Sequence, residues 1–145
     1  GAYEGKKKRE KVVSSIKVFD SYAIIAMLEE EPGGEKVTNI IKESSDNGNR
    51  LLLSIINLGE VYYITRRSVG KLHADAVIHK IDTLPIEVIP ADRRLTLLAA
   101  ELKSSKKMSY ADCFAAALAK MYGADLVTGD REFRAVKDLI HIIWI

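Results

Sequence analysis

Short apolar runs of strand length alternate with longer segments of helical periodicity along this chain of 145 residues. The clearest run is residues 51–54 (LLLS), where apolar side chains follow one another without the alternation of a half-exposed strand. Such a run is typical of a strand buried on both faces, as in a parallel sheet covered by helices. Further runs of strand length lie at residues 16–19, 86–89, 126–128 and 140–144.

Between the strands, apolar residues recur at helical spacing, and turn residues mark where these segments end. Pro32-Gly33-Gly34 and Gly70 predict helix breaks, Ser109 predicts an N-cap, and Gly123 predicts a helix end. The predicted helices cover residues 21–30, 35–45, 57–69, 71–84, 95–102 and 110–122. This alternation predicts an α/β fold with three layers, α/β/α, around a central, mostly parallel sheet of four or five strands.

Composition restricts the class of protein further. Hydrophobic residues make up 48% of the chain, enough for a core, and no apolar run approaches the roughly 20 residues of a membrane span. The start of the chain lacks the apolar run of a secretory signal, so we expect a cytoplasmic protein without membrane attachment. The single cysteine, Cys113, cannot form an internal disulfide and excludes a zinc site built on several thiolates.

Charge is concentrated at the start of the chain. Residues 1–11 carry five basic and two acidic side chains, whereas the whole chain has a formal net charge of +2. We therefore expect residues 1–15 to be a basic, flexible N-terminal tail and residues 16–145 to form one domain. A basic tail could contact phosphates, but a solvated terminus is the simpler interpretation.

Four acidic residues fall near the predicted carboxyl edge of the sheet. Asp20 directly follows the first strand, and Asp130 follows the run 126–128. Glu60 and Asp112 lie near the starts of predicted helices, and a helix that follows a strand begins at the edge where that strand ends. Ligands bind at this edge in open α/β sheets, so we expect the four carboxylates to converge.

Local structure offers another explanation for each acid. Ser109 to Asp112 has the spacing of a capping box, and Asn57 to Glu60 has a similar spacing. Asp20 and Asp130 could be plain turn residues. Capping would account for two acids, but we do not expect it to account for Asp20, which abuts a buried strand.

A divalent cation would offset the repulsion between converging carboxylates. Carboxylate oxygens without histidine or cysteine ligands favour Mg²⁺ or Mn²⁺ over Zn²⁺. Such an ion can activate water and stabilise negative charge on a phosphodiester. The acid set therefore predicts a divalent-metal site whose chemistry could serve phosphodiester hydrolysis.

The same segments resemble the PIN-domain nucleases, and most closely the VapC-type toxins of toxin–antitoxin pairs. The resemblance covers about residues 16–145, and its four segments occur in family order. These segments are Val18 to Ala23, Asn57 to Val61, SYADCFAAALA at 109–119 and LVTGDREF at 126–133. The basic tail is not part of the family pattern.

The resemblance implies a Mg²⁺- or Mn²⁺-dependent endoribonuclease that cuts single-stranded or looped RNA. It implies that Asp20, Glu60, Asp112 and Asp130 hold the metal, with Asp20, Asp112 and Asp130 closest to the ion. Ser21 and Thr128 would orient these carboxylates from outside the metal's own ligand set. It further implies a homodimer and a small antitoxin protein that inserts a segment into the active-site groove.

Two alternatives remain: a PIN nuclease that processes ribosomal or transfer RNA, and a non-catalytic RNA-binding domain of the same fold. Basic side chains that could contact RNA phosphates are Arg66, Arg67, Arg93, Arg94 and Arg131. The target RNA, the number of metal ions and the role of the tail do not follow from the sequence.

Overall fold

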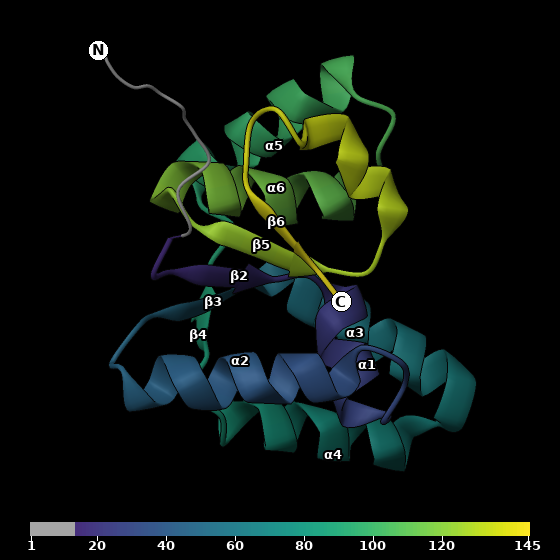
Figure 1. Cartoon of the computed structure of the whole chain (residues 1–145). Coiled ribbons are helices and arrows are strands. Elements are labelled where there is room, and N and C mark those ends of the chain that lie inside the picture. The colour runs from purple at the N-terminus through teal and green to yellow at the C-terminus, as the bar shows by residue number, and fades with distance from the viewer. Residues whose placement is uncertain (1–13) are drawn as a thin grey trace.

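A five-stranded, all-parallel sheet forms the centre of the protein (Figure 1). The computed structural model describes residues 14–145. Across the sheet the strand order is β4-β3-β2-β5-β6, and each neighbouring pair is parallel. The strands are β2 (Lys17–Phe19), β3 (Leu51–Ser54), β4 (Glu87–Ile89), β5 (Asp125–Thr128) and β6 (Ile142–Trp144).

Helices cover both faces of the sheet and complete the predicted α/β/α layering. One face is covered by α1 (Ser21–Leu28), α2 (Gly34–Asp46), α3 (Ile55–Val69) and α4 (Lys71–Asp82). The other is covered by α5 (Arg93–Ser105), α6 (Tyr110–Tyr122) and the 3-10 helix η2 (Arg131–Val136). In Figure 1 α5 and α6 lie on the opposite side of the strands from α2 and α4.

Neighbouring residues of the central strand enter different cores. Val18 packs with α5 and α6, whereas Phe19 packs with α1 to α4. Both are fully buried, as are Leu51, Leu52 and Leu53 of β3. Side chains alternate between the faces of a strand, so a strand that is apolar at every position must be covered on both sides. The unbroken apolar runs are therefore explained by the layering.

Most element boundaries agree with the predicted ones to within a few residues. Ser109 accepts a hydrogen bond from the Asp112 amide and caps α6, and Gly123 ends that helix with a φ of 58°. The prediction for α3 was wrong at its start, because Ser54 and not Asn57 caps this helix. The 3-10 helix η2 was not predicted, since its six residues are too few to show helical periodicity.

The chain order produces a reversal beside the central strand. From β2 the chain builds outward through β3 and β4, then returns to the other side of β2 with β5 and β6. In open parallel sheets a crevice forms outside the carboxyl ends of the two strands at such a reversal. Asp20 follows β2, and Asp130 lies two residues after β5, so the topology directs both toward this crevice.

The predicted tail, residues 1–15, lies almost wholly outside the described residues. Ser14 is described, and its backbone amide donates to both carboxylate oxygens of Asp125 at 3.1 Å. None of the helices in residues 14–145 combines the length and apolar character that crossing a membrane requires.

Candidate functional site

An acidic cavity of about 350 Å³ opens where β2 and β5 end. Among the described residues that line it there is no lysine or arginine. Its walls also include Ser21, Tyr22 and Ser109. The carboxylates that line it are Asp20, Glu31, Glu60, Asp112, Asp130 and Glu132. The four acids singled out in the sequence thus lie around one cavity, together with two more.

Asp20 is buried at the junction of β2 and α1. Its Oδ1 accepts a 2.8 Å hydrogen bond from the Ala23 amide and so caps α1. Its Oδ2 accepts a 2.5 Å hydrogen bond from the Thr128 hydroxyl at the end of β5. Capping therefore does account for part of the position of Asp20, contrary to our expectation. Each carboxylate oxygen has a second lone pair, so these two bonds leave room for a cation.

Asp130 and Glu132 come from one short element. Asp130 caps η2 by accepting from the Glu132 amide at 2.9 Å, and its own amide donates to the Thr128 hydroxyl oxygen at 2.9 Å. One carboxylate oxygen from each of Asp112, Asp130 and Glu132 lies within 4.8 Å of the other two. Two ligands on opposite sides of a Mg²⁺ ion are about 4.2 Å apart, given bonds of about 2.1 Å. The trio therefore lies close to the spacing that a hard divalent cation requires.

Glu60 lies on α3 and is held by α1. The Ser21 hydroxyl donates to Glu60 Oε1 at 2.6 Å, and the Asn57 side-chain amide approaches the same oxygen at 3.4 Å. Because Ser21 also follows Asp20 directly, a single turn of chain orients two of the acids. The structure thus places both predicted orienting residues, Ser21 and Thr128, in hydrogen-bonding contact with a cavity carboxylate.

Asn57 connects α3 to α6 below the cavity. It is fully buried, and its Nδ2 donates to the Ala111 carbonyl oxygen at 3.1 Å. Its Oδ1 is buried and has no hydrogen-bond partner among residues 14–145. The sequence interpretation of Asn57 as a helix cap was wrong, since the residue lies inside the first turn of α3. Its role is to join the helix of Glu60 to the turn that carries Asp112.

Burial and mutual repulsion change the acidity of the cavity. Burial raises the pKa of Asp20 to about 7, opposed by the hydrogen bonds from Thr128 and Ala23 and reinforced by Asp112 and Asp130. Burial, followed by the negative charges of Asp130 and Glu60, raises the pKa of Asp112 to about 6. Both shifts mean that negative charge in the cavity is costly in the absence of a neutralising cation.

Sequence reasoning did not identify Glu132 and Glu31. Glu132 could have been recognised, because it follows Asp130 by two residues. An aspartate that caps a helix lies next to the residues of the first turn of that helix. Glu31 left none, since it lies in the connection between α1 and α2 and reaches the cavity through tertiary packing.

The five arginines predicted to contact RNA lie outside the cavity lining. Arg66 donates to the Tyr62 hydroxyl, and the Arg67 guanidinium lies 5.3 Å from the Tyr63 ring centroid. Arg93 and Arg94 begin α5, and Arg131 begins η2 beside the acidic residues. Their contact with RNA stays a prediction.

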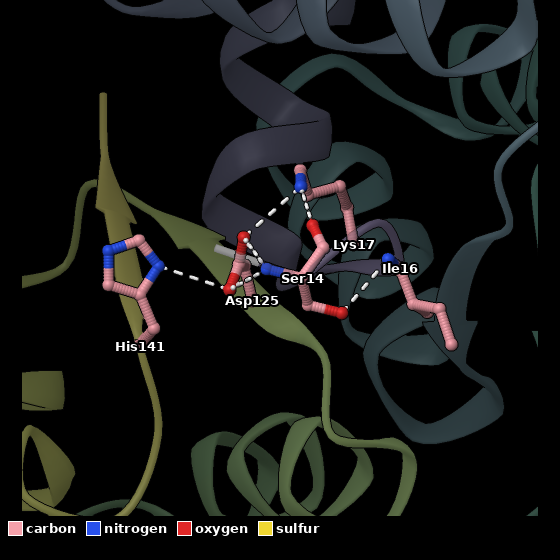
Figure 2. A network of polar contacts seen from close by, with 5 residues as sticks. All are labelled: Ser14, Ile16, Lys17, Asp125 and His141. Atoms are coloured by element: carbon pink, nitrogen blue, oxygen red, sulfur yellow. Dashed lines mark hydrogen bonds and ion pairs between the residues drawn. The ribbon is translucent and has the colours of Figure 1, made fainter. Parts of the chain in front are cut away.

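A second polar cluster lies at the opposite edge of the sheet, where the strands begin (Figure 2). Asp125 is 1% exposed, forms an ion pair with Lys17 at 3.1 Å and is hydrogen-bonded to His141 Nδ1 at 3.0 Å. It also accepts from the Ser14 amide, so four hydrogen bonds surround one carboxylate. This cluster joins β2, β5 and the start of β6. We therefore interpret it as a structural cluster that holds these strands together.

Fold and cavity together define a three-layer α/β/α protein with a carboxylate-lined candidate metal site at its strand-order reversal. The family described as "PIN domain" matches residues 17–139. The chain belongs to the PIN-domain family. No curated protein matches the chain.

Solved structures show the same fold. VapBC2 from Rickettsia felis, bound to a DNA fragment of its promoter, has a TM-score of 0.72 at 20% identity, covering 90% of this chain and 98% of that one. VapC20 from Mycobacterium tuberculosis, described as a sarcin–ricin loop cleaving toxin, has a TM-score of 0.65 at 17% identity, with coverages of 83% and 94%. VapBC from Salmonella typhimurium, also bound to DNA, has a TM-score of 0.65 at 23% identity, with coverages of 88% and 96%.

Proposed function

We propose that this protein is a Mg²⁺- or Mn²⁺-dependent endoribonuclease that cuts single-stranded or looped RNA and serves as the toxin of a toxin–antitoxin pair. The observation that carries the proposal is the convergence of six carboxylates, from separate segments, on one cavity that no lysine or arginine of residues 14–145 lines. A fold gains nothing from concentrating unpaired negative charge unless a cation neutralises it.

The donor set fits a hard divalent cation. Asp112, Asp130 and Glu132 would hold it, and Asp20 and Glu60 would add charge beside it. When bound, the ion would activate water and offset the negative charge that develops on the cleaved phosphate. Other residues of the chain would orient these acids for metal binding.

Thr128 and Ser21 keep the carboxylates in fixed positions. The Thr128 hydroxyl donates to Asp20 and accepts from the Asp130 amide, and therefore couples the acids that follow β2 and β5. Ser21 orients Glu60 from the opposite wall. Carboxylates oriented in this way lose less freedom when they bind a cation, which strengthens binding.

An antitoxin partner and a homodimer belong to the same proposal. Support for the antitoxin comes from the fold, which matches several VapBC toxin–antitoxin complexes over most of each chain. The homodimer rests on the family resemblance alone. The acidic cavity would also attract a basic segment of a partner protein through charge complementarity.

Cleavage of labelled RNA tests the catalytic part of the proposal. Structured and unstructured RNAs are incubated with Mg²⁺, with Mn²⁺ or with EDTA, using wild-type protein, Asp112→Asn and Asp46→Asn. Asp46 ends α2 on the surface and serves as the matched control. We expect metal-dependent cleavage that Asp112→Asn abolishes and Asp46→Asn retains. Cleavage in EDTA, or full activity of Asp112→Asn, would contradict the mechanism.

Expression in cells separates the toxin from its two alternatives. A toxin should arrest growth when expressed, and co-expression of a small protein encoded next to it should restore growth. An RNA-processing enzyme would cleave RNA without arresting growth. A non-catalytic RNA-binding domain would show no tight Mn²⁺ binding in calorimetry. Asp112→Asn controls for effects of expression alone.

A further inference from the structure

A groove of about 360 Å³ runs between η2 and the edge strand β6, next to the acidic cavity. No aspartate or glutamate is among the described residues that line it. Its walls are formed by Arg134, Lys137, Ile140, His141, Ile142 and Trp144. The charge of this groove is therefore opposite to that of the cavity.

Arg131, the first residue of η2, lies between the two hollows. Asp130 and Glu132 line the cavity, and Arg131 lies between them in the chain. The Arg131 guanidinium lies over the ring of Trp144, 5.1 Å from its centroid, and Trp144 lines the groove. From this point η2 carries Arg134 and leads on to Lys137, which follows its last residue. One short element thus has a carboxylate end in the cavity and a basic end in the groove.

Like most lysines and arginines of the described chain, those on and just after η2 form no ion pair within it. Lys17, Arg50 and Lys71 each form an ion pair with a carboxylate. Arg131, Arg134 and Lys137 form none with any partner in residues 14–145, although all three are exposed. No carboxylate of residues 14–145 would therefore have to be displaced when these side chains meet an anion.

An acidic cavity repels the phosphates of its own substrate, so the substrate must be held by positive charge nearby. Binding of nucleic acid rests largely on lysine and arginine contacts to phosphates. In the described chain such side chains line the η2–β6 groove, and η2 links this groove to the cavity residues Asp130 and Glu132. Its volume is in the range of small-ligand sites, which suits a short stretch of one strand.

We propose that the η2–β6 groove binds the backbone of single-stranded RNA on one side of the cleaved bond and leads the strand into the acidic cavity. This inference rests on the proposed ribonuclease function. Arg134 and Lys137 contact phosphates, and Arg131, held over Trp144, marks the point where the strand enters the cavity.

Binding of fluorescent single-stranded RNA, measured by anisotropy over a range of salt concentrations, tests the groove. The proteins are Asp112→Asn, which prevents cleavage, and the same chain with Arg134→Ala and Lys137→Ala added. Lys42→Ala with Lys80→Ala, two exposed lysines of α2 and α4, is the matched control. We expect the groove variant to bind about tenfold more weakly, and its slope of log affinity against log salt to fall by about 1.4 for two lost phosphate contacts. The control should change neither value.

Steady-state cleavage by proteins with an intact Asp112 completes the test. Loss of the groove cations should raise KM and leave kcat nearly unchanged, because phosphate contacts away from the cleaved bond contribute uniform binding. Affinity and KM equal to those of the control would overturn the groove proposal while leaving the nuclease intact. Groove-dependent RNA binding without any cleavage would refute the proposed function and retain the groove. A wild-type protein that binds no RNA would overturn both.

Discussion

The side-chain amide of Asn57 donates a 3.1 Å hydrogen bond to the carbonyl oxygen of Ala111 and ties the first turn of α3 to the first turn of α6. Glu60 follows one turn later on α3, and Asp112 follows Ala111 directly. A single buried amide therefore sets the spacing between two carboxylates that belong to distant parts of the chain.

Replacement of Asn57 by alanine should loosen this spacing. The Ala111 carbonyl oxygen would lose its hydrogen bond from Asn57, a loss that destabilises a fold by about 0.5–1.5 kcal/mol. Misplaced acids should weaken Mn²⁺ binding roughly tenfold or more, as observed when residues supporting metal ligands are removed. Calorimetric titration with Mn²⁺ and thermal unfolding measure the two effects. Asn39→Ala, on the exposed face of α2, should change neither, and unaltered Mn²⁺ affinity in Asn57→Ala would refute the positioning role.

Asp20→Asn should stabilise the metal-free protein at neutral pH. The folded state raises the pKa of Asp20 to about 7, whereas an aspartate in an unfolded chain has a pKa of about 3.9. Well below a pH of about 3.9, Asp20 is protonated in both the folded and the unfolded state, and the full stability is present. As pH rises from 4 through 7 the unfolded chain releases this proton first, so stability is lost across that window. Asparagine cannot ionise and avoids the loss.

Melting temperatures in EDTA at pH 4 and pH 7.5 measure this effect. The variant should match the wild-type protein near pH 4 and exceed it by roughly 5–10 °C at pH 7.5. The pKa values of Asp75 and Glu87 are lowered by Lys71 and Arg50 respectively, so these groups change stability with pH in the opposite direction to Asp20. Both proteins contain these groups, so their contributions cancel when the variant is compared with wild type. A difference that is the same at both pH values would contradict the assignment. Asp46→Asn, exposed at the end of α2, should show no pH-dependent difference.

Glu132→Gln should weaken Mn²⁺ binding, because Glu132 supplies one oxygen of the trio that lies within 4.8 Å. We expect a loss of about tenfold or more in calorimetric titration. Glu31→Gln is the matched control, since Glu31 lines the same cavity but lies outside the trio. Equal effects of the two substitutions would show that the cavity binds metal through its overall charge and not through this trio.

Asp125→Asn should destabilise the fold without affecting the metal site. The substitution leaves Lys17 without its buried carboxylate and removes the partner of His141 (Figure 2). Breaking a buried ion pair by removing one partner costs about 3–5 kcal/mol. Urea unfolding should show this loss, with Mn²⁺ affinity retained because Asp125 begins β5 whereas the cavity lies beyond its end. Asp138→Asn, an exposed neighbour, should be close to neutral, and a loss of Mn²⁺ affinity in Asp125→Asn would contradict the separation of the two clusters.

The layers and most helix ends could be predicted from sequence because they depend on local chemistry. An apolar run such as Leu51 to Leu53 requires cover on both faces wherever it lies in the fold. Ser109 and Gly123 act on backbone groups within a few residues, so their roles as cap and stop are visible in the sequence. The edge at which Asp20 and Asp130 lie follows equally from their positions after strands.

Tertiary structure decided which side chains share the cavity and which hydrogen bonds orient them. Glu31 enters the cavity, Asn57 bonds to a carbonyl 54 residues away, and Thr128 reaches Asp20 across 108 residues. These contacts depend on the order of strands across the sheet and on how the helices pack, which no local pattern specifies. The sequence by itself determined the elements and the edge where the acids collect. Only packing over long chain separations fixed the distances between their oxygens, and those distances decide whether a cation can be held.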